Sequence, residues 1–253
     1  MNIRFNHSEL FAISFAALLA VTGCQSSHES CCSMSGCSMT ASAAVSAVQS
    51  KDSQAAMTPD AALAELKAGN ARFVAGQPLH RDLPAQVKAT ASGQYPYAVV
   101  LSCLDSRQPI ELVLDQGVGD IFSARVAGNI LDDDILGSME FACKVSGAKL
   151  IAVIGHSNCG AIKGAIDDVD LGNLTGLLTK IKPAMDAVPA DVQPRTTKNY
   201  TFVNAVSEAN VRLVMQQIRE RSPILRAMLD SGQIGLVGGM YDLATGKVQF
   251  YDK

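Results

Sequence analysis

The chain has 253 residues, of which 48% are hydrophobic and 18% charged, and its formal net charge is −3. This length and composition fit one large or two small folded domains. The Lys and Arg residues form no long basic run. The sequence therefore offers no clustered positive charge for the phosphates of a nucleic acid, and nucleic-acid binding is not expected.

The seven cysteines are unevenly distributed. An odd number without regular spacing argues against a disulfide framework in the body of the chain and leaves metal binding or catalysis open there. Four of them lie within the first forty residues, at Cys24, Cys31, Cys32 and Cys37. The other three are spread further along, at Cys103, Cys143 and Cys159.

Residues 1–24 are predicted to be an export signal. Arg4 precedes an apolar stretch over residues 10–21 that is too short to cross a bilayer comfortably as a mature helix. The stretch ends in small residues before Cys24, as in bacterial lipoprotein precursors, in which this cysteine is lipidated. We therefore expect a lipid anchor in the bacterial cell envelope, at the outer membrane facing the periplasm. An ordinary cleaved signal or a short core helix is the alternative.

Residues 25–57 are rich in Ser and Ala and have few large apolar side chains. Such a segment buries too little surface to offset the entropy lost on ordering, so a flexible tether is expected. Within it, Cys31, Cys32 and Cys37 alternate with Ser and Met. Soft sulfur ligands suit Cu(I), whereas an exporting compartment favours local disulfides; both interpretations stay open.

A catalytic domain is expected over residues 58–253, with strands and helices that alternate. Thr58 and Pro59 have the residue types of a helix start, which predicts a helix over 59–75. Alternating strands and helices predict an α/β fold with a mainly parallel central sheet flanked by helices and a C-terminal hairpin-like strand pair. Strands are expected at 97–102, 120–126, 150–154, 234–241 and 247–251, and helices at 110–114, 135–142, after Cys159, at 204–221 and from Pro223.

Two of these strands run into turns that contain metal-ligating residues. The strand at 97–102 leads to Cys103 and Asp105, and the strand at 150–154 leads to His156 and Cys159. The carboxyl ends of parallel strands meet at one edge of a sheet, so the turns could share an ion. Cys, His, Cys and a carboxylate are a tetrahedral zinc set. Taken alone, the His–Cys pair could equally be two buried core residues.

Arg107 affects the role expected for Asp105. The two side chains are two residues apart and can pair through a bidentate fork, which would hold the carboxylate off the metal. Three firm ligands and one exchangeable position are typical of catalytic zinc, whereas a structural site usually closes with four Cys or His ligands. Without a metal, the same two residues would form a surface ion pair of little energy.

The two turns, Cys103–Arg107 and His156–Gly160, resemble the motifs of the β-class carbonic anhydrases. The resemblance covers nearly everything from residue 58 to the end. It also includes the segments Asp115–Gly117, Arg125–Asn129, Leu136–Glu140 and Gly239–Gly246. It implies the fold of that family and reversible hydration of carbon dioxide to bicarbonate and a proton.

The resemblance also assigns roles to the residues of the two turns. It implies one Zn²⁺ per subunit on Cys103, His156 and Cys159, with Asp105 as an exchangeable fourth ligand. In the implied reaction, zinc-bound hydroxide attacks carbon dioxide. The Asp105–Arg107 dyad orients this hydroxide and controls access to the fourth position.

The substrate pocket implied by the resemblance is of the plant type. Phe122, Ala127 and Phe141 would form its apolar wall. Gln94 and the backbone amide near Gly160 would bind the product oxygens. Some family members also have an inhibitory bicarbonate site that uses a tryptophan; this chain has no tryptophan, so we expect none of that kind.

Two other functions and the assembly state stay open at this point. Hydrolysis of carbon disulfide or carbonyl sulfide on the same fold is the nearest alternative. A non-catalytic metal-binding lipoprotein, in which zinc is structural, belongs to a different class. Family members assemble as dimers or larger even-numbered oligomers, often with the active site at the subunit border. A homodimer or homotetramer is therefore expected, with the helix at 59–75 as a candidate to reach across a neighbour.

Overall fold

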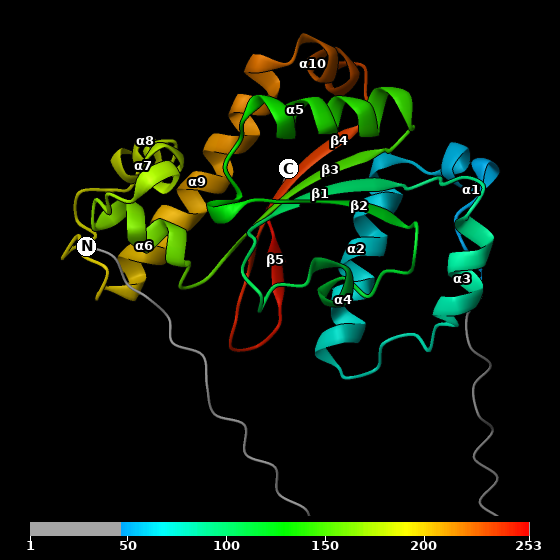
Figure 1. Ribbon diagram of the computed structural model, residues 1–253, viewed down its shortest axis with the longest axis horizontal. Coiled ribbons are helices and arrows are strands. Elements are labelled where there is room, and N and C mark those ends of the chain that lie inside the picture. The colour runs from blue at the N-terminus through cyan, green and yellow to red at the C-terminus, as the bar shows by residue number, and fades with distance from the viewer. Residues whose placement is uncertain (1–46, 253) are drawn as a thin grey trace, which may run out of the picture. The chain divides into compact units, whose positions relative to one another are not determined.

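The structure is a computed structural model that describes residues 47–252. At its centre lies a five-stranded sheet in the order β2-β1-β3-β4-β5 (Figure 1). The first four strands are parallel and β5 runs antiparallel to β4, which confirms the predicted α/β fold. The strands are β1 (Ala98–Ser102), β2 (Ile121–Arg125), β3 (Leu150–His156), β4 (Gly235–Tyr241) and β5 (Val248–Phe250).

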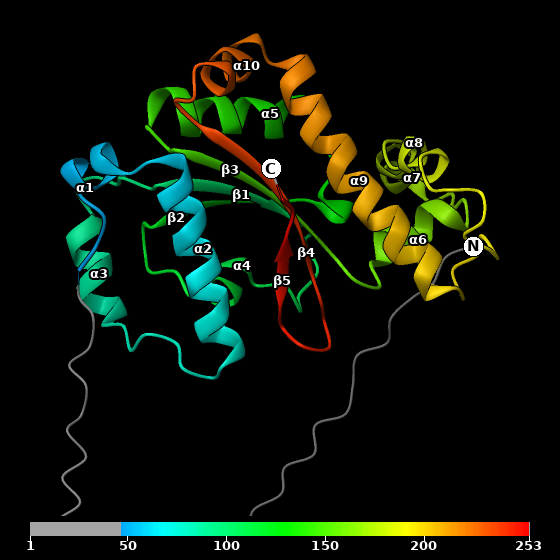
Figure 2. The same cartoon turned by 180° about the vertical axis from the view of Figure 1, so that it is seen from behind.

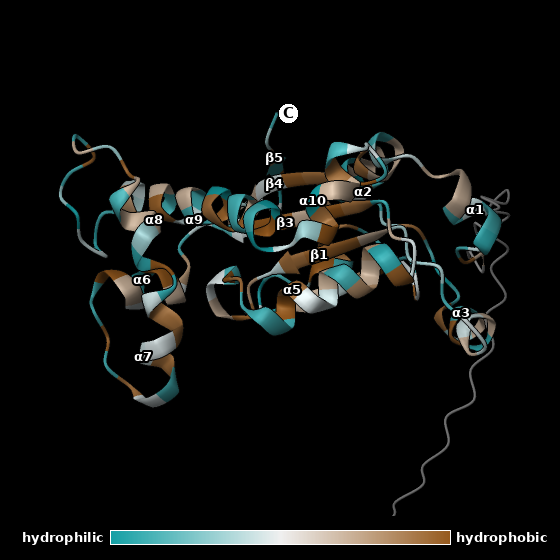
Figure 3. Cartoon of the chain, turned by 90° about the horizontal axis from the view of Figure 1, so that it is seen from above, coloured by the Kyte–Doolittle hydropathy of each residue, from teal (hydrophilic) through white to brown (hydrophobic). Residues whose placement is uncertain are grey.

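The central strands are buried on both faces because successive side chains point to opposite sides of the sheet. Val99 and Leu101 pack in one cluster with side chains of α5, α9 and α10, whereas Ala98 and Val100 pack in another with side chains of α2 and α4. Figures 1 and 2 show the course of these helices around the sheet. Hydrophobic colour runs along β1 and β3 in Figure 3. These helices are α2 (Pro59–Val74), α4 (Ile110–Val113), α5 (Asp133–Glu140), α9 (Tyr200–Arg221) and α10 (Pro223–Asp230).

A third group of helices covers the end of the sheet beyond the carboxyl end of β3. Their apolar side chains, including Ile162, Ile181 and Phe202, pack around Cys103 and Cys159. Cys103 and Cys159 are thus enclosed by a hydrophobic layer of their own. The group consists of α6 (Gly160–Ile166), α7 (Gly172–Thr179), α8 (Lys182–Asp186) and the first half of α9.

Helix starts follow the capping chemistry of the sequence. The Thr58 hydroxyl accepts a hydrogen bond from the backbone of Ala61 at the start of α2, as predicted. Ser222 caps α10 in the same way. Helix α9 differs from the prediction because it begins at Tyr200 rather than at residue 204, with Asn199 as its cap.

One helix lies inside the segment expected to be a tether. Helix α1 (Lys51–Ala56) begins with a reciprocal capping box between Ser50 and Ser53. The buried amide of Gln54 donates hydrogen bonds to the carbonyls of Pro96 at 2.7 Å and Ser146 at 2.8 Å. The folded part therefore starts before the predicted boundary at residue 58.

A further helix, α3 (Leu83–Thr90), occupies the link between α2 and β1, where no helix was expected. Asp82 caps it by accepting a hydrogen bond from the backbone of Ala85. Leu83 and Val87 are both exposed on this helix, so the segment lacks the buried apolar face from which helices are predicted.

Residues 1–46 and 253 lie outside the described part of the chain. The predicted export signal, the lipidation of Cys24, the sulfur-rich run and most of the predicted tether fall there. Within the part that is described, no helix has both the length and the apolar character needed to cross a membrane.

Candidate metal centre

Cys103, His156 and Cys159 meet at the adjoining carboxyl ends of β1 and β3. The register pairs Ser102 with Ile154, so the residues that follow leave the sheet side by side. The three ligand atoms all lie within 4.8 Å of one another, and all three residues are buried. The prediction that the two turns come together is confirmed.

The imidazole of His156 is oriented as in metal-binding histidines. Its Nδ1 lies 2.9 Å from the carbonyl oxygen of Ser157. Because a carbonyl only accepts, Nδ1 carries the proton and Nε2 keeps its lone pair. This Nε2 is buried and has no hydrogen-bond partner among residues 47–252. A buried nitrogen lone pair without a hydrogen-bond donor needs an explanation, and a bound cation provides one.

The two cysteines share a proton across an Sγ–Sγ distance of 4.0 Å. The hydrogen bond from Cys159 lowers the pKa of Cys103 to about 4. The same hydrogen bond, together with burial, raises the pKa of Cys159 far above its ordinary value. A divalent cation between the sulfurs would displace that proton. Tetrahedral zinc with Zn–S bonds of about 2.3 Å needs sulfurs about 3.8 Å apart, so the observed spacing fits.

Asp105 and Arg107 form the predicted fork beside this cluster. Arg107 Nε donates to Oδ1 at 2.9 Å and Nη2 donates to Oδ2 at 2.7 Å. These hydrogen bonds hold the pKa of Asp105 well below its usual range, despite an opposing effect of burial. Asp105 Oδ2 lies 3.8 Å from His156 Nε2. An ionised carboxylate, fixed by a guanidinium, therefore lies at the edge of the cluster.

Arg125 supports the first ligand turn, a role that the sequence did not reveal. From the end of β2, its Nε donates to the carbonyl of Cys103 at 3.1 Å and its Nη2 to the carbonyl of Asp105 at 2.7 Å. Its segment belongs to the family-like motifs, but only the pairing of Ser102 with Arg125 places it beside the turn. Three strands thus contribute to the geometry of the site.

Two of the predicted pocket residues adjoin the cluster. Ala127 lies in a short 3₁₀ turn after β2 and precedes Gly128, whose backbone amide donates to the Cys103 sulfur at 3.3 Å. Gly160 follows Cys159 directly and begins α6. Both positions agree with a pocket next to the metal ligands.

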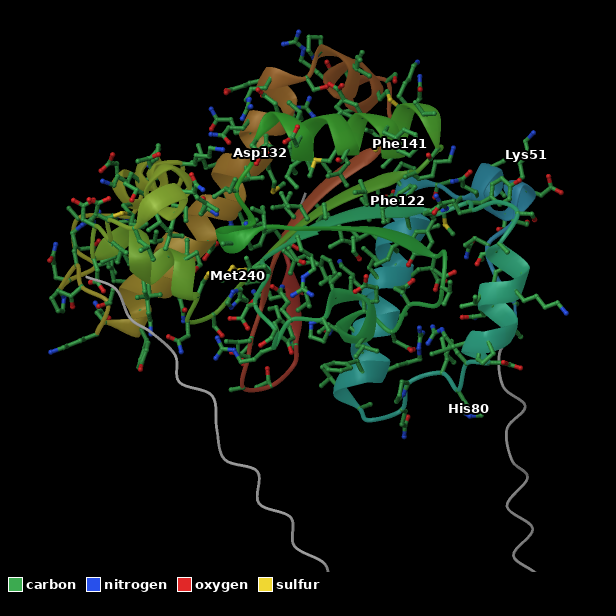
Figure 4. All side chains as sticks on the ribbon, viewed as in Figure 1. Lys51, His80, Phe122, Asp132, Phe141 and Met240 are labelled. Carbon is green, nitrogen blue, oxygen red and sulfur yellow. The ribbon has the colours of Figure 1, made fainter. Side chains whose placement is uncertain are left out.

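The other three predicted pocket residues lie away from the cluster of their own chain. Phe122 pairs with Val99 in the sheet, and its ring meets that of Phe141 edge to face, with centroids 6.3 Å apart (Figure 4). The two rings line a hollow of about 670 Å³, here called the Phe122–Phe141 hollow. None of the described residues around it is a predicted metal ligand. Its other members include Val99, Ala124, Ile135 and Ser138.

Gln94 is separated from the cluster by the length of β1. It precedes the amino end of that strand, whereas Cys103 follows the carboxyl end. Five strand residues span about 16 Å. His80, the other histidine of the described residues, is exposed in the loop after α2 (Figure 4). One chain therefore holds the three predicted metal ligands and only part of the predicted pocket.

Comparisons with known proteins agree with this geometry. The carbonic anhydrase family model matches residues 98–248. The carbonic anhydrase of Mycolicibacterium smegmatis is 36% identical over 192 residues, covering 76% of this chain and 92% of that protein. Carbonic anhydrase 2 of Mycobacterium tuberculosis is 34% identical over 195 residues, covering 77% of this chain and 93% of that protein.

Solved structures show the same likeness. The β-carbonic anhydrase of the fungal pathogen Aspergillus fumigatus aligns with a TM-score of 0.60 and 27% identity, covering 76% of this chain and 90% of that one. A second β-carbonic anhydrase aligns with a TM-score of 0.59 and 25% identity, covering 75% of this chain and 95% of that one. The chain belongs to the β class of the carbonic anhydrase family and is an enzyme of that family.

Proposed function

We propose that this chain hydrates carbon dioxide reversibly to bicarbonate and a proton, with one Zn²⁺ held by Cys103, His156 and Cys159. The observation that supports it best is the arrangement of the cluster. A buried, unpartnered imidazole nitrogen faces two sulfurs that share one proton. A carboxylate kept ionised by Arg107 lies beside them. When bound, Zn²⁺ lowers the pKa of water to about 7 and so supplies hydroxide at neutral pH.

Asp105 acts as an acceptor that orients the attacking oxygen. Because its pKa lies below the usual range, it accepts hydrogen bonds and does not donate a proton at neutral pH. Arg107 contacts both carboxylate oxygens and so restrains Asp105 from approaching the metal. Loss of this fork would free Asp105 to become the fourth ligand and compete with water.

A second copy of the chain completes the substrate pocket. Phe141 is 51% exposed, and the partly buried Phe122 belongs to β2, one of the two edge strands of the described sheet. The two rings line an open hollow, where a neighbouring chain can dock. In a dimer or larger even-numbered oligomer, the Gln94, Phe122 and Phe141 of one chain would lie against the cluster of another. Ala127 and Gly160 would come from the chain that holds the metal.

Stopped-flow measurement of carbon dioxide hydration by the zinc-loaded protein tests the proposal. The wild-type chain should be active. Asp105→Asn should keep its zinc, but its kcat should fall about 100-fold, a typical effect of losing a side chain that takes part in moving a proton. An inactive wild type, or full activity in Asp105→Asn, would contradict the proposal. Assays with carbon disulfide and carbonyl sulfide should give slower turnover than carbon dioxide.

We also propose that the chain is exported and anchored by lipid at Cys24, with residues 25–46 as a tether. The support is the apolar stretch at 10–21 and the small residues before Cys24. Metabolic labelling of cells with a palmitate analogue should label the wild-type chain and leave Cys24→Ala unlabelled. Equal labelling of the two proteins would rule out this anchor.

A further inference from the structure

Two amide side chains of α9 reach the surroundings of the metal-ligand cluster: Asn204 bonds the ligand turn at Asn158, and Asn210 bonds the turn at Gly128 that contacts Cys103. Asn210 lies on the buried side of this helix, where its neighbours are mostly valines, and Asn204 is half-buried. Asn210 is almost fully buried, with 1% of its surface exposed. Its position inside an apolar layer is unusual for an amide, because buried polar groups lower stability unless they are fully paired.

Asn210 acts on Cys103 through one glycine. Its Nδ2 donates to the carbonyl oxygen of Gly128 at 2.8 Å, and the amide of Gly128 donates to the Cys103 sulfur at 3.3 Å. Gly128 has a φ of 66°, and a Cβ there would lie 2.8 Å from Ile181 Cδ1. This left-handed φ favours glycine, and glycine leaves the backbone free to move unless another group holds it.

Asn204 holds the second ligand turn. Its Oδ1 accepts a hydrogen bond of 2.9 Å from the backbone amide of Asn158. Asn158 lies between His156 and Cys159 and has a φ of 54°, a left-handed conformation that asparagine adopts more readily than most residues. The hydrogen bond from α9 therefore fixes this turn at the point where it presents both ligands.

Asn210 is not explained by helix stability. Asparagine is a weak helix former, and its Oδ1 is buried without a partner among the described residues. A leucine of similar shape would suit the surrounding valines better. The unfavourable amide is balanced by its one good hydrogen bond, and that bond goes to the turn that contacts Cys103.

We propose that Asn204 and Asn210 are positioning residues that hold the ligand turn at Asn158 and the turn at Gly128, and through them the sulfurs of Cys103 and Cys159, at metal-binding spacing before a cation enters. The pair acts from one rigid helix of 22 residues on two turns that are far apart in the sequence. The proposal rests on the proposed function only in taking zinc as the cation.

The test compares Asn210→Leu with Ser207→Ala. Ser207 is also buried on α9, and its hydroxyl has no hydrogen-bond partner among the described residues, so it is a matched control whose side chain donates to neither turn. In Asn210→Leu the zinc dissociation constant, measured by competition with a chelator, should rise at least about 10-fold, the usual effect of losing an outer-sphere contact. In Ser207→Ala it should stay at the wild-type value.

The Co²⁺-substituted proteins give a second, spectroscopic readout. The thiolate-to-cobalt charge-transfer band should shift and broaden in Asn210→Leu and stay unchanged in Ser207→Ala. Wild-type affinity and spectrum in Asn210→Leu would overturn the proposal. A lower melting temperature of the zinc-free variant, with affinity and spectrum unchanged, would also overturn it, because it would show a purely structural role.

Two features keep the result interpretable. If Asn210→Leu does not fold, the partly buried Asn204 can be replaced by Ala, with the same expected rise in the dissociation constant from the other turn. Neither readout requires turnover. A wild-type chain that binds zinc but does not hydrate carbon dioxide would therefore contradict the proposed function and leave this inference standing.

Discussion

The metal-ligand cluster and the Phe122–Phe141 hollow differ in how completely one chain builds them. Cys103, His156 and Cys159 are buried and held by hydrogen bonds from β2, from the turn at Gly128 and from α9. The hollow is open, and Phe141 at its rim is half exposed. One chain thus holds the whole proposed metal-binding cluster, whereas the proposed apolar wall for the substrate would need a neighbour.

The difference follows from the topology of the sheet. Adjacent parallel strands end at the same edge, so side chains that follow β1 and β3 meet without help from another chain. Phe122 lies inside β2 and Gln94 precedes β1, and neither position faces that edge. If this account holds, changes in the two regions should separate zinc binding from turnover.

Loss of a metal ligand should have the largest effect. His156→Ala removes the imidazole that faces the two sulfurs, so the chain should lose its zinc and its hydration activity should fall to the uncatalysed rate. Cys143→Ala is the matched control, because Cys143 is buried in a different core cluster. Metal analysis of the purified proteins should show zinc in the control and none in His156→Ala. Normal zinc content in His156→Ala would disprove the assigned ligand set.

A change in the hollow should reduce turnover and leave the metal in place. Phe122→Ala removes an aromatic ring from the wall, and we expect kcat/KM for carbon dioxide to fall about 10-fold, the scale of a lost apolar contact. The zinc dissociation constant should not change, because Phe122 lies within β2, beside Val99 and away from the ligand turns of its own chain. A parallel fall in zinc affinity would show that the two regions are not independent.

The ionisation of Cys143 should have the smallest effect of the three, a change in thermal stability with pH. Burial raises its pKa to about 12, so the folded state keeps this proton when the unfolded chain has lost it. The contribution of the protonated Cys143 thiol to the free energy of unfolding is full below the pKa of an unfolded cysteine, about 8.5, and declines as the pH rises toward about 12. Wild type should therefore lose part of its advantage in melting temperature over Cys143→Ala between about pH 8 and pH 10, where this decline begins. A constant difference over that range would contradict the assignment.

The local parts of the site were predictable from the sequence. Cys103, Asp105 and Arg107 occupy one turn, His156 and Cys159 the other, and the apolar runs before them identify the strands. The fork between Asp105 and Arg107 follows from their spacing alone. Metal-binding and capping motifs can be predicted because their chemistry lies within a few residues.

Contacts between distant segments were not predictable in the same way. Asn210 is separated from Gly128 by 82 positions, and Arg125 reaches Cys103 only because β2 pairs with β1 in the observed register. Helix α1 was missed since its Ser- and Ala-rich sequence carries no apolar face, although a buried Gln54 attaches it to the domain. These features depend on tertiary packing, which overrides local pattern.

The most direct test of the central claim is activity in mixed oligomers of two defective chains. Asp105→Asn impairs the metal side of the site and Phe122→Ala impairs the wall. If each site combines the cluster of one chain with the wall of another, co-expressed oligomers that contain both variants have some fully intact sites. The hydration rate per zinc of these oligomers should be about one quarter of the wild-type rate if they are tetramers and about one half if they are dimers. A rate equal to the average of the two single variants would show that each chain works alone.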